Sequence, residues 1–528
     1  MVENKDIVMR KTILIEKLSV NLIAWMMTII MFFLSMVSIL YRSYIDVTYQ
    51  EIIHYRKDNV VLAVIFVLAV ITVIYLLQKK KWLDRIPTKI LLIIMLIYVT
   101  VVSGLWAYTT DSIPVADQRS ILNCVQGLIH GDYSCMDPKS PAGYLQYNRH
   151  QVGLTAFLEL FTRFFTGGDA NYHAVYGLNV FMIAGIFLGL YLITTQLTAR
   201  KDVVNLELFL SFGMFQLMMY STFVYGLIPG LFFVVFGIYS MLRLFKSKKW
   251  YFGVLMSLMC AFSIIMKSNY MVFLIAVGIT IIVKAIGEKY PLYLMYLMLA
   301  IVFFVGINTT AQKVYENRTG IEFGDTIPNT AYLAMAMQEG PMAPGWFNGF
   351  NHVTYRDNNY NETITDQISR EYIAERLQEF ANNPKECIEF YYKKIVSQWN
   401  EVTYECFWIS INGENRTREL SPIMEKIYIG TIHTMAESVM NLYQLLLFVG
   451  TFVLAATARK NNDISKMILL LCLLGGFLFH ILWEGKSQYI ISYFPLFLPC
   501  AAIGLIAFVD CLKLKRGKES SNGFFAEK

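Results

Sequence analysis

The amino-acid sequence predicts an all-α polytopic membrane protein with an α-rich domain outside the membrane. Of the 528 residues, 56% are hydrophobic and only 16% are charged, which is too few to give a soluble globule a polar surface. The apolar residues gather in about twelve stretches, each long enough to cross a bilayer as a helix. The basic residues of the short connections alternate with these stretches so that they collect on one side.

Each stretch is predicted to be one transmembrane helix, because it is apolar over roughly the 20 residues that a bilayer requires. In chain order the predicted spans are 19–40, 59–77, 90–108, 175–197, 204–220, 224–245, 251–267, 270–287, 291–310, 437–457, 467–483 and 489–510.

Placing the N-terminus inside puts the basic short loops on the cytoplasmic side, among them Lys79 to Lys81, Arg200 with Lys201, and Lys248 with Lys249. This is the positive-inside pattern, and it predicts a multi-pass protein of the cell membrane with both termini in the cytoplasm. The net charge of +6 then lies beside anionic membrane lipids. No nucleic-acid partner is expected, because no basic stripe is interleaved with aromatic residues.

Two connections are long, and both fall on the predicted outer side. Residues 108–171 follow the third span and form the first outer loop. Long ordered connections in compact proteins are usually functional. The chain is therefore divided into an N-terminal transmembrane region (1–310), an extracytoplasmic domain (311–436), and a C-terminal part (437–528) with further transmembrane helices and a basic cytoplasmic tail.

Helical spacing of apolar residues predicts further helices in these outer segments, at 120–129, 364–382 and 385–398. The apolar run 152–165 is shorter than a membrane span. Counting it as a span would also invert the charge bias of every later loop. It is therefore expected to be interfacial or re-entrant.

The sequence contains no Walker loop and no strand followed by a G-x-G-x-x-G helix. Its eight cysteines include no C-x-x-C pair, and no metal cluster is visible. The surfaces large enough for an active site face outward, where nucleotide-activated donors are normally absent. A group transfer there requires a lipid-linked donor.

Two aspartates and a glutamine in the first outer loop are candidate site residues. Asp117 and Gln118 begin the interfacial helix, and Asp111 stands just beyond the third span. A carboxylate here could accept a proton from an acceptor hydroxyl as a sugar leaves its phosphate. The alternative is that Asp117 caps the helix, since an Asp oxygen accepts backbone N–H bonds well.

Lys267 and Lys486 are isolated basic residues on the predicted outer face, and either ammonium would suit a lipid phosphate. The alternatives are that Lys486 pairs with Glu484 and that Lys267 snorkels toward head groups. Glu484 and Tyr489 share the last outer turn with Lys486. His150 could position a phosphate or polarise an acceptor, or it is a hydrogen-bonded structural histidine.

The order of several short motifs resembles the polytopic C-type glycosyltransferases, the superfamily of the protein O-mannosyltransferases and the lipid A aminoarabinose transferases, and most of all their Gram-positive family 39-type relatives. The motifs are "VADQ", "YNRHQVGL", "MKSNY", "GWFNGFN", "SQWNEVTYECFW" and "WEGKSQY". This resemblance implies a GT-C-like fold, a polyprenyl-phosphate sugar donor, an inverting transfer on the outer face, and a catalytic Asp that maps best to Asp117.

The sequence departs from the mannosyltransferase pattern, which has Asp-Glu where this chain has Asp117 and Gln118. The acceptor therefore stays open between a glycan, a lipid and a protein, and a divalent metal ion stays an open alternative as cofactor. The alternative function is that of a multi-pass transporter or lipid flippase, because about twelve spans are also typical of such proteins. A polysaccharide polymerase or ligase would share the lipid-linked donor. The predicted substrate-binding residues are Asp111, Gln118, His150, Lys267, Glu484, Lys486 and Tyr489.

Overall fold

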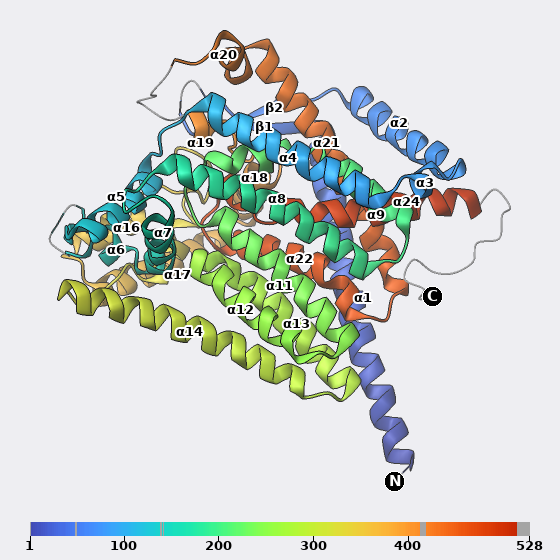
Figure 1. The fold of residues 1–528 in the computed structure, drawn as a ribbon, viewed down its shortest axis with the longest axis horizontal. Coiled ribbons are helices and arrows are strands. Elements are labelled where there is room, and N and C mark those ends of the chain that lie inside the picture. Colours follow the sequence, from blue (N-terminus) through green and yellow to red (C-terminus); the bar gives the residue numbers. More distant parts are fainter. Residues whose placement is uncertain (1, 48–49, 138–139, 141, 412–418, 515–528) are drawn as a thin grey trace.

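The computed structural model describes residues 2–47, 50–137, 140, 142–411 and 419–514. These residues form a helical bundle (Figure 1), and ten of its helices are long and apolar enough to cross a membrane. This confirms the predicted all-α polytopic membrane fold. The ten helices are α1 (Val2–Leu40), α2 (Val60–Lys79), α4 (Thr88–Thr110), α8 (Tyr172–Leu197), α11 (Leu227–Ser247), α13 (Met271–Glu288), α14 (Leu292–Thr319), α21 (Thr431–Thr457), α22 (Ile468–Leu482) and α24 (Phe497–Leu514).

Two predicted spans differ from single long helices. The stretch 204–220 is broken into α9 (Lys201–Ser211) and the pair α10 (Phe215–Met219) and η3 (Tyr220–Thr222), with a bend of 50° between them. Gly213 lies at the break, and the Tyr443 hydroxyl donates to the Leu210 carbonyl at 2.8 Å. The same carbonyl accepts the Gly213 amide at 3.0 Å, so the Tyr443 hydroxyl adds a second bond that ties the end of α9 to α21.

The stretch 251–267 forms α12 (Trp250–Met266), an apolar helix of 17 residues, which is slightly shorter than the roughly 20 residues of a typical span. The count of long apolar helices is therefore ten, or eleven with the bent pair, rather than about twelve. Hydropathy located every one of these segments, but it could not foresee the break at Gly213, because the apolar run continues through it.

The remaining helices are short or lie in the two long segments between spans. They are α3 (Trp82–Arg85), α5 (Ala116–His130), η1 (Ser134–Met136), α6 (Tyr144–Tyr147), η2 (Arg149–Gln151), α7 (Val152–Phe165), η4 (Ser268–Tyr270), α15 (Asn329–Met335), α16 (Phe350–Asp357), α17 (Glu362–Asn382), α18 (Pro384–Trp399), α19 (Trp408–Ile411), α20 (Pro422–Tyr428), η5 (Ala458–Lys460), η6 (Ile464–Met467), α23 (Ser487–Ile490) and η7 (Phe494–Leu496). The helices predicted at 120–129, 364–382 and 385–398 correspond to α5, α17 and α18.

A β-hairpin that hydropathy did not indicate follows α1. Strand β1 (Tyr41–Ile45) pairs antiparallel with β2 (Ile53–Lys57). The hairpin docks on the chain after α18, where the Ser43 amide donates to the Asn400 carbonyl at 3.1 Å. Each strand has five residues, too few for an alternating pattern to be recognised beside a long apolar helix. The connection between the strands carries Glu51.

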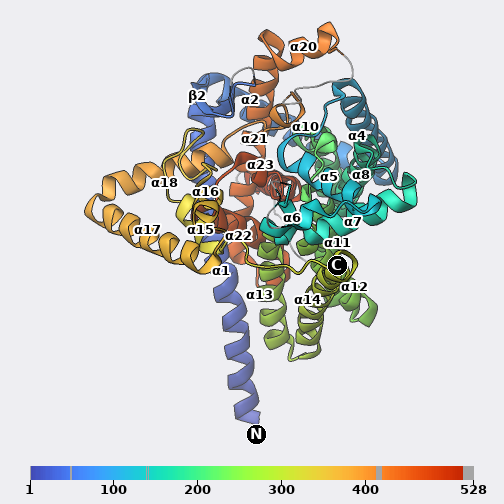
Figure 2. The ribbon, with the colours of Figure 1, turned by 90° about the vertical axis from the view of Figure 1, so that its left-hand side faces the viewer.

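The two long segments lie at the same end of the bundle. Helices α5 to α7 and helices α16 and α17 gather at the left of Figure 1, and Figure 2, which also shows α15, views the molecule from that side. The turn between α2 and α3, the start of α9 and the end of α24 lie at the opposite end (Figure 1). Helix α14 continues through the predicted domain boundary at residue 310, and the basic tail after Leu514 lies outside the described residues.

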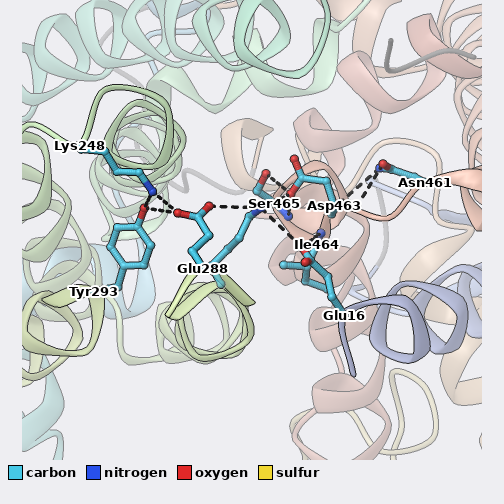
Figure 3. A network of polar contacts seen from close by, with 9 residues as sticks. Glu16, Lys248, Glu288, Tyr293, Asn461, Asp463, Ile464 and Ser465 are labelled. Carbon is cyan, nitrogen blue, oxygen red and sulfur yellow. Dashed lines mark hydrogen bonds and ion pairs between the residues drawn. The ribbon is translucent and has the colours of Figure 1, made fainter. Parts of the chain in front are cut away.

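A polar network joins helix ends on the predicted inner side (Figure 3). The Lys284 ammonium lies 2.8 Å from the Asp463 carboxylate and 3.5 Å from that of Glu16. Glu16 also accepts the Ile464 amide at 2.9 Å. On the other side of this network, Lys248 pairs with Glu288. These contacts fasten α1 to α13 and to the turn before α22, so the amino-terminal helix is fixed to the bundle by charge as well as by apolar packing.

The positive-inside pattern gives a testable prediction of sidedness. Asn382 at the end of α17 and Asn462 in the turn before η6 are both exposed. In a background without the eight native cysteines, we expect Asn382→Cys to react with a membrane-impermeant maleimide in intact cells. The matched variant Asn462→Cys should react only after permeabilisation. The opposite labelling would place the long segments in the cytoplasm and exclude the outer orientation.

Candidate functional site

Asp117 lies in the first turn of α5 with an exposed side chain. The buried face of α5 packs against α7 through Ile121, Val125 and Leu158, which fixes where the helix begins. Val115 is the N-cap residue and makes no side-chain cap bond. In the described part of the chain, the hydrogen bond to the Asp117 carboxylate comes from the Tyr225 hydroxyl, at 3.5 Å. The carboxylate is therefore not used as a helix cap and faces solvent.

The backbone immediately before Asp117 is strained. Ala116 has a φ of 50°, a left-handed conformation that costs a residue with a side chain about 1 to 3 kcal/mol. Strain of this kind persists where the surrounding structure over-determines it, and it is concentrated at functional sites. The strained residue immediately precedes Asp117, whose carboxylate accepts from Tyr225.

Lys267 lies between α12 and η4, and its side chain is only 8% exposed. Its ammonium lies 4.3 Å from the centre of the Tyr225 ring and 5.0 Å from that of the Tyr489 ring. None of the carboxylates that the structure describes lies within ion-pair distance of it. Burial lowers the pKa of Lys267 to about 8, although the more distant Glu484 and Asp117 oppose this shift. The site thus contains a desolvated cation whose neighbours are aromatic faces, which is a suitable place for an anionic ligand.

A glycine brings Tyr225 and Lys267 together. A Cβ atom on Gly226 would lie 1.8 Å from the Met266 carbonyl oxygen and 3.2 Å from the Lys267 Cβ. Only glycine permits the two chain turns to approach this closely. The Tyr225 hydroxyl also accepts a hydrogen bond from the Gln151 side chain. Tyr225 therefore connects Asp117, Lys267 and the start of α7. It was not a predicted site residue, because it stands within an apolar stretch.

Glu484 and Tyr489 complete this side of the site. The Tyr489 hydroxyl donates to Glu484 at 3.1 Å, and the carboxyl group is 8% exposed. Burial raises the pKa of Glu484, and the lysines Lys486 and Lys267 counteract part of that effect. Glu484 is therefore a buried acid held by a tyrosine, rather than the ion-pair partner predicted for Lys486.

His150 borders the same site from η2. Its side chain is exposed to solvent on one side. Many protein atoms lie around the rest of the ring and partly desolvate it. This desolvation, together with the nearby charge of Lys267, lowers the pKa of His150 to about 4. The ring is neutral at neutral pH, so it can offer a hydrogen bond to a ligand but no positive charge.

Lys486 is neutralised by two carboxylates, one fully buried and one partly buried. It forms an ion pair with Glu51 from the hairpin connection, and it lies 3.5 Å from Glu405. Glu405 is fully buried and accepts the Ser487 hydroxyl at 2.9 Å and the Gln488 amide at 3.0 Å. Burial raises the pKa of Glu405; the Lys486 ammonium counteracts part of this shift, and the neighbouring Glu51 carboxylate adds to it. In contrast to Lys267, Lys486 has its charge compensated by the protein itself.

The other two predicted residues serve the architecture. Asp111 is 4% exposed and receives a hydrogen bond from His173 at 2.9 Å. The side chain of Gln118 is buried and accepts the Val224 amide at 2.8 Å, which fixes the chain just before Tyr225. The structure therefore brings together Asp117, His150, Lys267, Glu484 and Tyr489. It places Lys486 beside them in an ion-pair cluster and turns Asp111 toward α8.

No group of three or more His, Cys, Asp or Glu side chains within the described ranges is arranged to hold a metal ion. The cysteines in those ranges are free thiols. A divalent metal ion therefore stays an open alternative that the protein's own side chains do not specify.

Comparison with solved structures finds a likeness in fold. No family model and no curated protein sequence matches the chain. The fold is similar to that of the archaeal oligosaccharyltransferase AglB from Archaeoglobus fulgidus, solved in complex with an inhibitory peptide and a dolichol-phosphate. The TM-score is 0.44 at 12% sequence identity, over 84% of this chain and 53% of the archaeal chain. This chain thus spans about half the length of that enzyme, and a likeness at this level assigns no activity.

The different partners of the two lysines give a stability prediction. Lys486→Met should lower the free energy of unfolding by about 3 to 5 kcal/mol, because removing one partner leaves buried carboxylate charge uncompensated. The loss should shrink at low pH, where the carboxylates are protonated. Unfolding of the purified protein in detergent, followed by heat or denaturant, measures both effects.

Lys267→Met is the matched control, since it removes a similarly buried ammonium that has no carboxylate partner. We expect it to leave stability unchanged or slightly higher. Adding Glu405→Gln to Lys486→Met should restore part of the loss. If both single lysine variants were equally destabilised, the Lys486 ion pairs would not be the source of the effect.

Proposed function

We propose that the protein is a membrane glycosyltransferase that moves a sugar from a polyprenyl-phosphate donor to an extracytoplasmic acceptor. The observation that carries this proposal is that an exposed carboxylate, Asp117, and an uncompensated ammonium, Lys267, meet at one tyrosine, Tyr225. A base and an anion-binding group side by side are what transfer from a sugar phosphate to a hydroxyl requires. The order of motifs that resembles the C-type glycosyltransferases supports the same activity.

In this proposal Lys267 binds the phosphate that leaves, and Asp117 binds the hydroxyl that attacks. The acceptor oxygen forms a bond to the anomeric carbon while the bond from that carbon to the phosphate oxygen breaks. The electron pair leaves with polyprenyl phosphate, whose charge the Lys267 ammonium stabilises. Asp117 takes the proton of the acceptor hydroxyl. Attack opposite the phosphate inverts the anomeric configuration, as the family resemblance implies.

The surrounding groups suit these two roles. The rings of Tyr225 and Tyr489 flank the Lys267 ammonium and exclude water from it, which strengthens its attraction for a phosphate. The neutral imidazole of His150 can hold a hydroxyl without competing for the proton. The site lies at helix ends, as a lipid-phosphate head group at the membrane surface requires, and the donor's polyprenyl chain would remain among the apolar spans.

Asp117→Asn tests the role of the base. We expect the variant to insert and to bind donor normally but to transfer sugar about 100- to 10,000-fold more slowly, the range typical of a positioned acid or base. The measurement is the release of polyprenyl phosphate from a sugar-charged polyprenyl phosphate by purified protein. That release also separates a transferase from a transporter or flippase, which would leave the lipid intact.

Asp111→Asn is the matched control, because it changes the second aspartate of the same loop, whose carboxylate is bound to His173. It should keep most of the transfer rate. Near-normal turnover in Asp117→Asn together with loss in Asp111→Asn would move the base to Asp111.

The low pKa of Lys267 predicts a pH dependence of donor binding. Only the protonated amine attracts the phosphate, so donor affinity should fall as pH rises through about 8, the pKa of this side chain in the free protein. Lys267→Ala should weaken donor binding by about 10- to 150-fold below that pH, the value of a charge-assisted contact. Titration with a sugar-charged polyprenyl phosphate across the pH range measures both.

Lys267→Arg provides the control for this titration, because a guanidinium stays protonated at every accessible pH. Its donor affinity, whatever its absolute value, should not fall near pH 8. A decline that persists unchanged in Lys267→Arg would assign the titration to another group.

A further inference from the structure

A polar groove opens beside the candidate site, between three segments that are distant in sequence. It has a volume of about 250 Å³ and is lined by Arg149 and His150 of η2, by Asn308 and Gln312 of α14, and by Asn329 and Tyr332 of the chain that enters and forms α15. None of the groups used for the proposed chemistry, apart from His150, belongs to it.

Residues of the groove adjoin the Asp117 and Lys267 site at two places. At one, His150 of the groove is followed by Gln151, whose side chain donates to the Tyr225 hydroxyl. At the other, the ring of Tyr332 stacks on Trp483 with 5.7 Å between centroids and 10° between planes. Trp483 immediately precedes Glu484. A ligand in the groove would therefore reach the position between Asp117 and Lys267.

The lining has free hydrogen-bonding capacity of both kinds. The side-chain amides of Asn308 and Asn329 make no hydrogen bond within the part of the chain that the structure describes. Each can donate through its NH₂ group and accept through its oxygen. Arg149 is held in place by bonds of 3.1 and 2.8 Å to the Gln312 side-chain oxygen, which leaves its charge uncompensated by that partner.

The groups that line the groove are suited to a ligand rich in hydroxyl groups. A hydroxyl donates and accepts at once, so adjacent hydroxyl groups are matched by side-chain amides. The ring of Tyr332 supplies an apolar face on which the C–H side of a sugar ring can lie. The lining contains no carboxylate that would attract an amine and little apolar surface that would hold a lipid chain. It also lacks a strand edge to which a peptide could add.

We propose that this groove binds a carbohydrate acceptor and presents one of its hydroxyl groups to Asp117. The inference rests on the proposed function, and it chooses a glycan over a lipid or a protein as the acceptor. The sugar of the donor has the same chemistry and is the other source of a carbohydrate here, so the experiment separates the two.

The double variant Asn308→Ala/Asn329→Ala removes both free amides without removing a hydrogen bond of the fold. The donor is a hexosyl polyprenyl phosphate, and the acceptor probes are p-nitrophenyl hexosides, a serine- and threonine-containing peptide, and a diacylglycerol. We expect transfer to at least one hexoside, with its KM raised on the order of 10-fold in the double variant because two hydrogen bonds are lost. Donor cleavage by water, measured without acceptor, should stay within about twofold of the original rate.

Asn382→Ala, which changes an exposed asparagine of α17, is the matched control and should alter neither rate. Equal loss of donor cleavage and of transfer in the double variant would mean that the groove holds the donor's sugar. Transfer to the peptide or the diacylglycerol alone would exclude a glycan acceptor. Unchanged KM for the hexoside would remove the groove from acceptor binding while leaving the proposed function intact.

Binding of a sugar to the groove can also be measured independently of catalysis. Saturation-transfer NMR with methyl hexosides should detect contact with the unchanged protein and a weaker contact with Asn308→Ala/Asn329→Ala. If the unchanged protein failed to cleave any lipid-linked sugar, the proposed function would be wrong. Sugar binding lost in the double variant would then still establish the groove as a carbohydrate site, and no binding to either protein would overturn it.

Discussion

The Lys486 ammonium between the carboxylates of Glu51 and Glu405 is the contact on which the candidate site depends. It joins the hairpin connection, the chain after α18 and the last outer turn. Glu405 adopts a left-handed φ of 63°, as does Tyr404 before it at 47°. This strain is tolerated because the buried carboxylate binds both Lys486 and the start of α23. The turn that carries Glu484 and Tyr489 is thereby held beside Lys267.

Lys486 and Lys267 differ in the groups that surround their charges. Lys267 and Lys486 lie near the same site, but Lys486 has carboxylate neighbours and Lys267 has aromatic rings as neighbours. A buried ammonium without a carboxylate is unfavourable for folding, since burial disfavours its charge. Lys267 therefore gains most from an anion that arrives with a ligand. In the proposed function, the phosphate of the donor is that anion.

Much of the fold was predictable because lipid imposes a simple rule on sequence. A span must be apolar over its whole length and satisfy its own backbone bonds, so hydropathy locates helices such as α8 and α21 directly. The candidate site was predictable only in part. Lys267, Lys486 and Asp117 stand out by charge, but the partners Glu51 and Glu405 are remote in sequence. Tyr225 was hidden because a tyrosine at the start of an apolar stretch looks like an interfacial anchor.

The position of the candidate site favours a transferase over a transporter. Transporter sites lie near the bilayer midplane, where interrupted helices of two matched halves expose backbone groups. Here Tyr225 precedes α11, Lys267 follows α12 and Glu484 follows α22, so the polar groups stand at helix ends. At the interrupted pair α9 and α10, the Leu210 carbonyl accepts both the Tyr443 hydroxyl and the Gly213 amide. Under the proposed function, a site at helix ends beside the two long segments would let a lipid head group enter from the membrane surface while an acceptor enters from water.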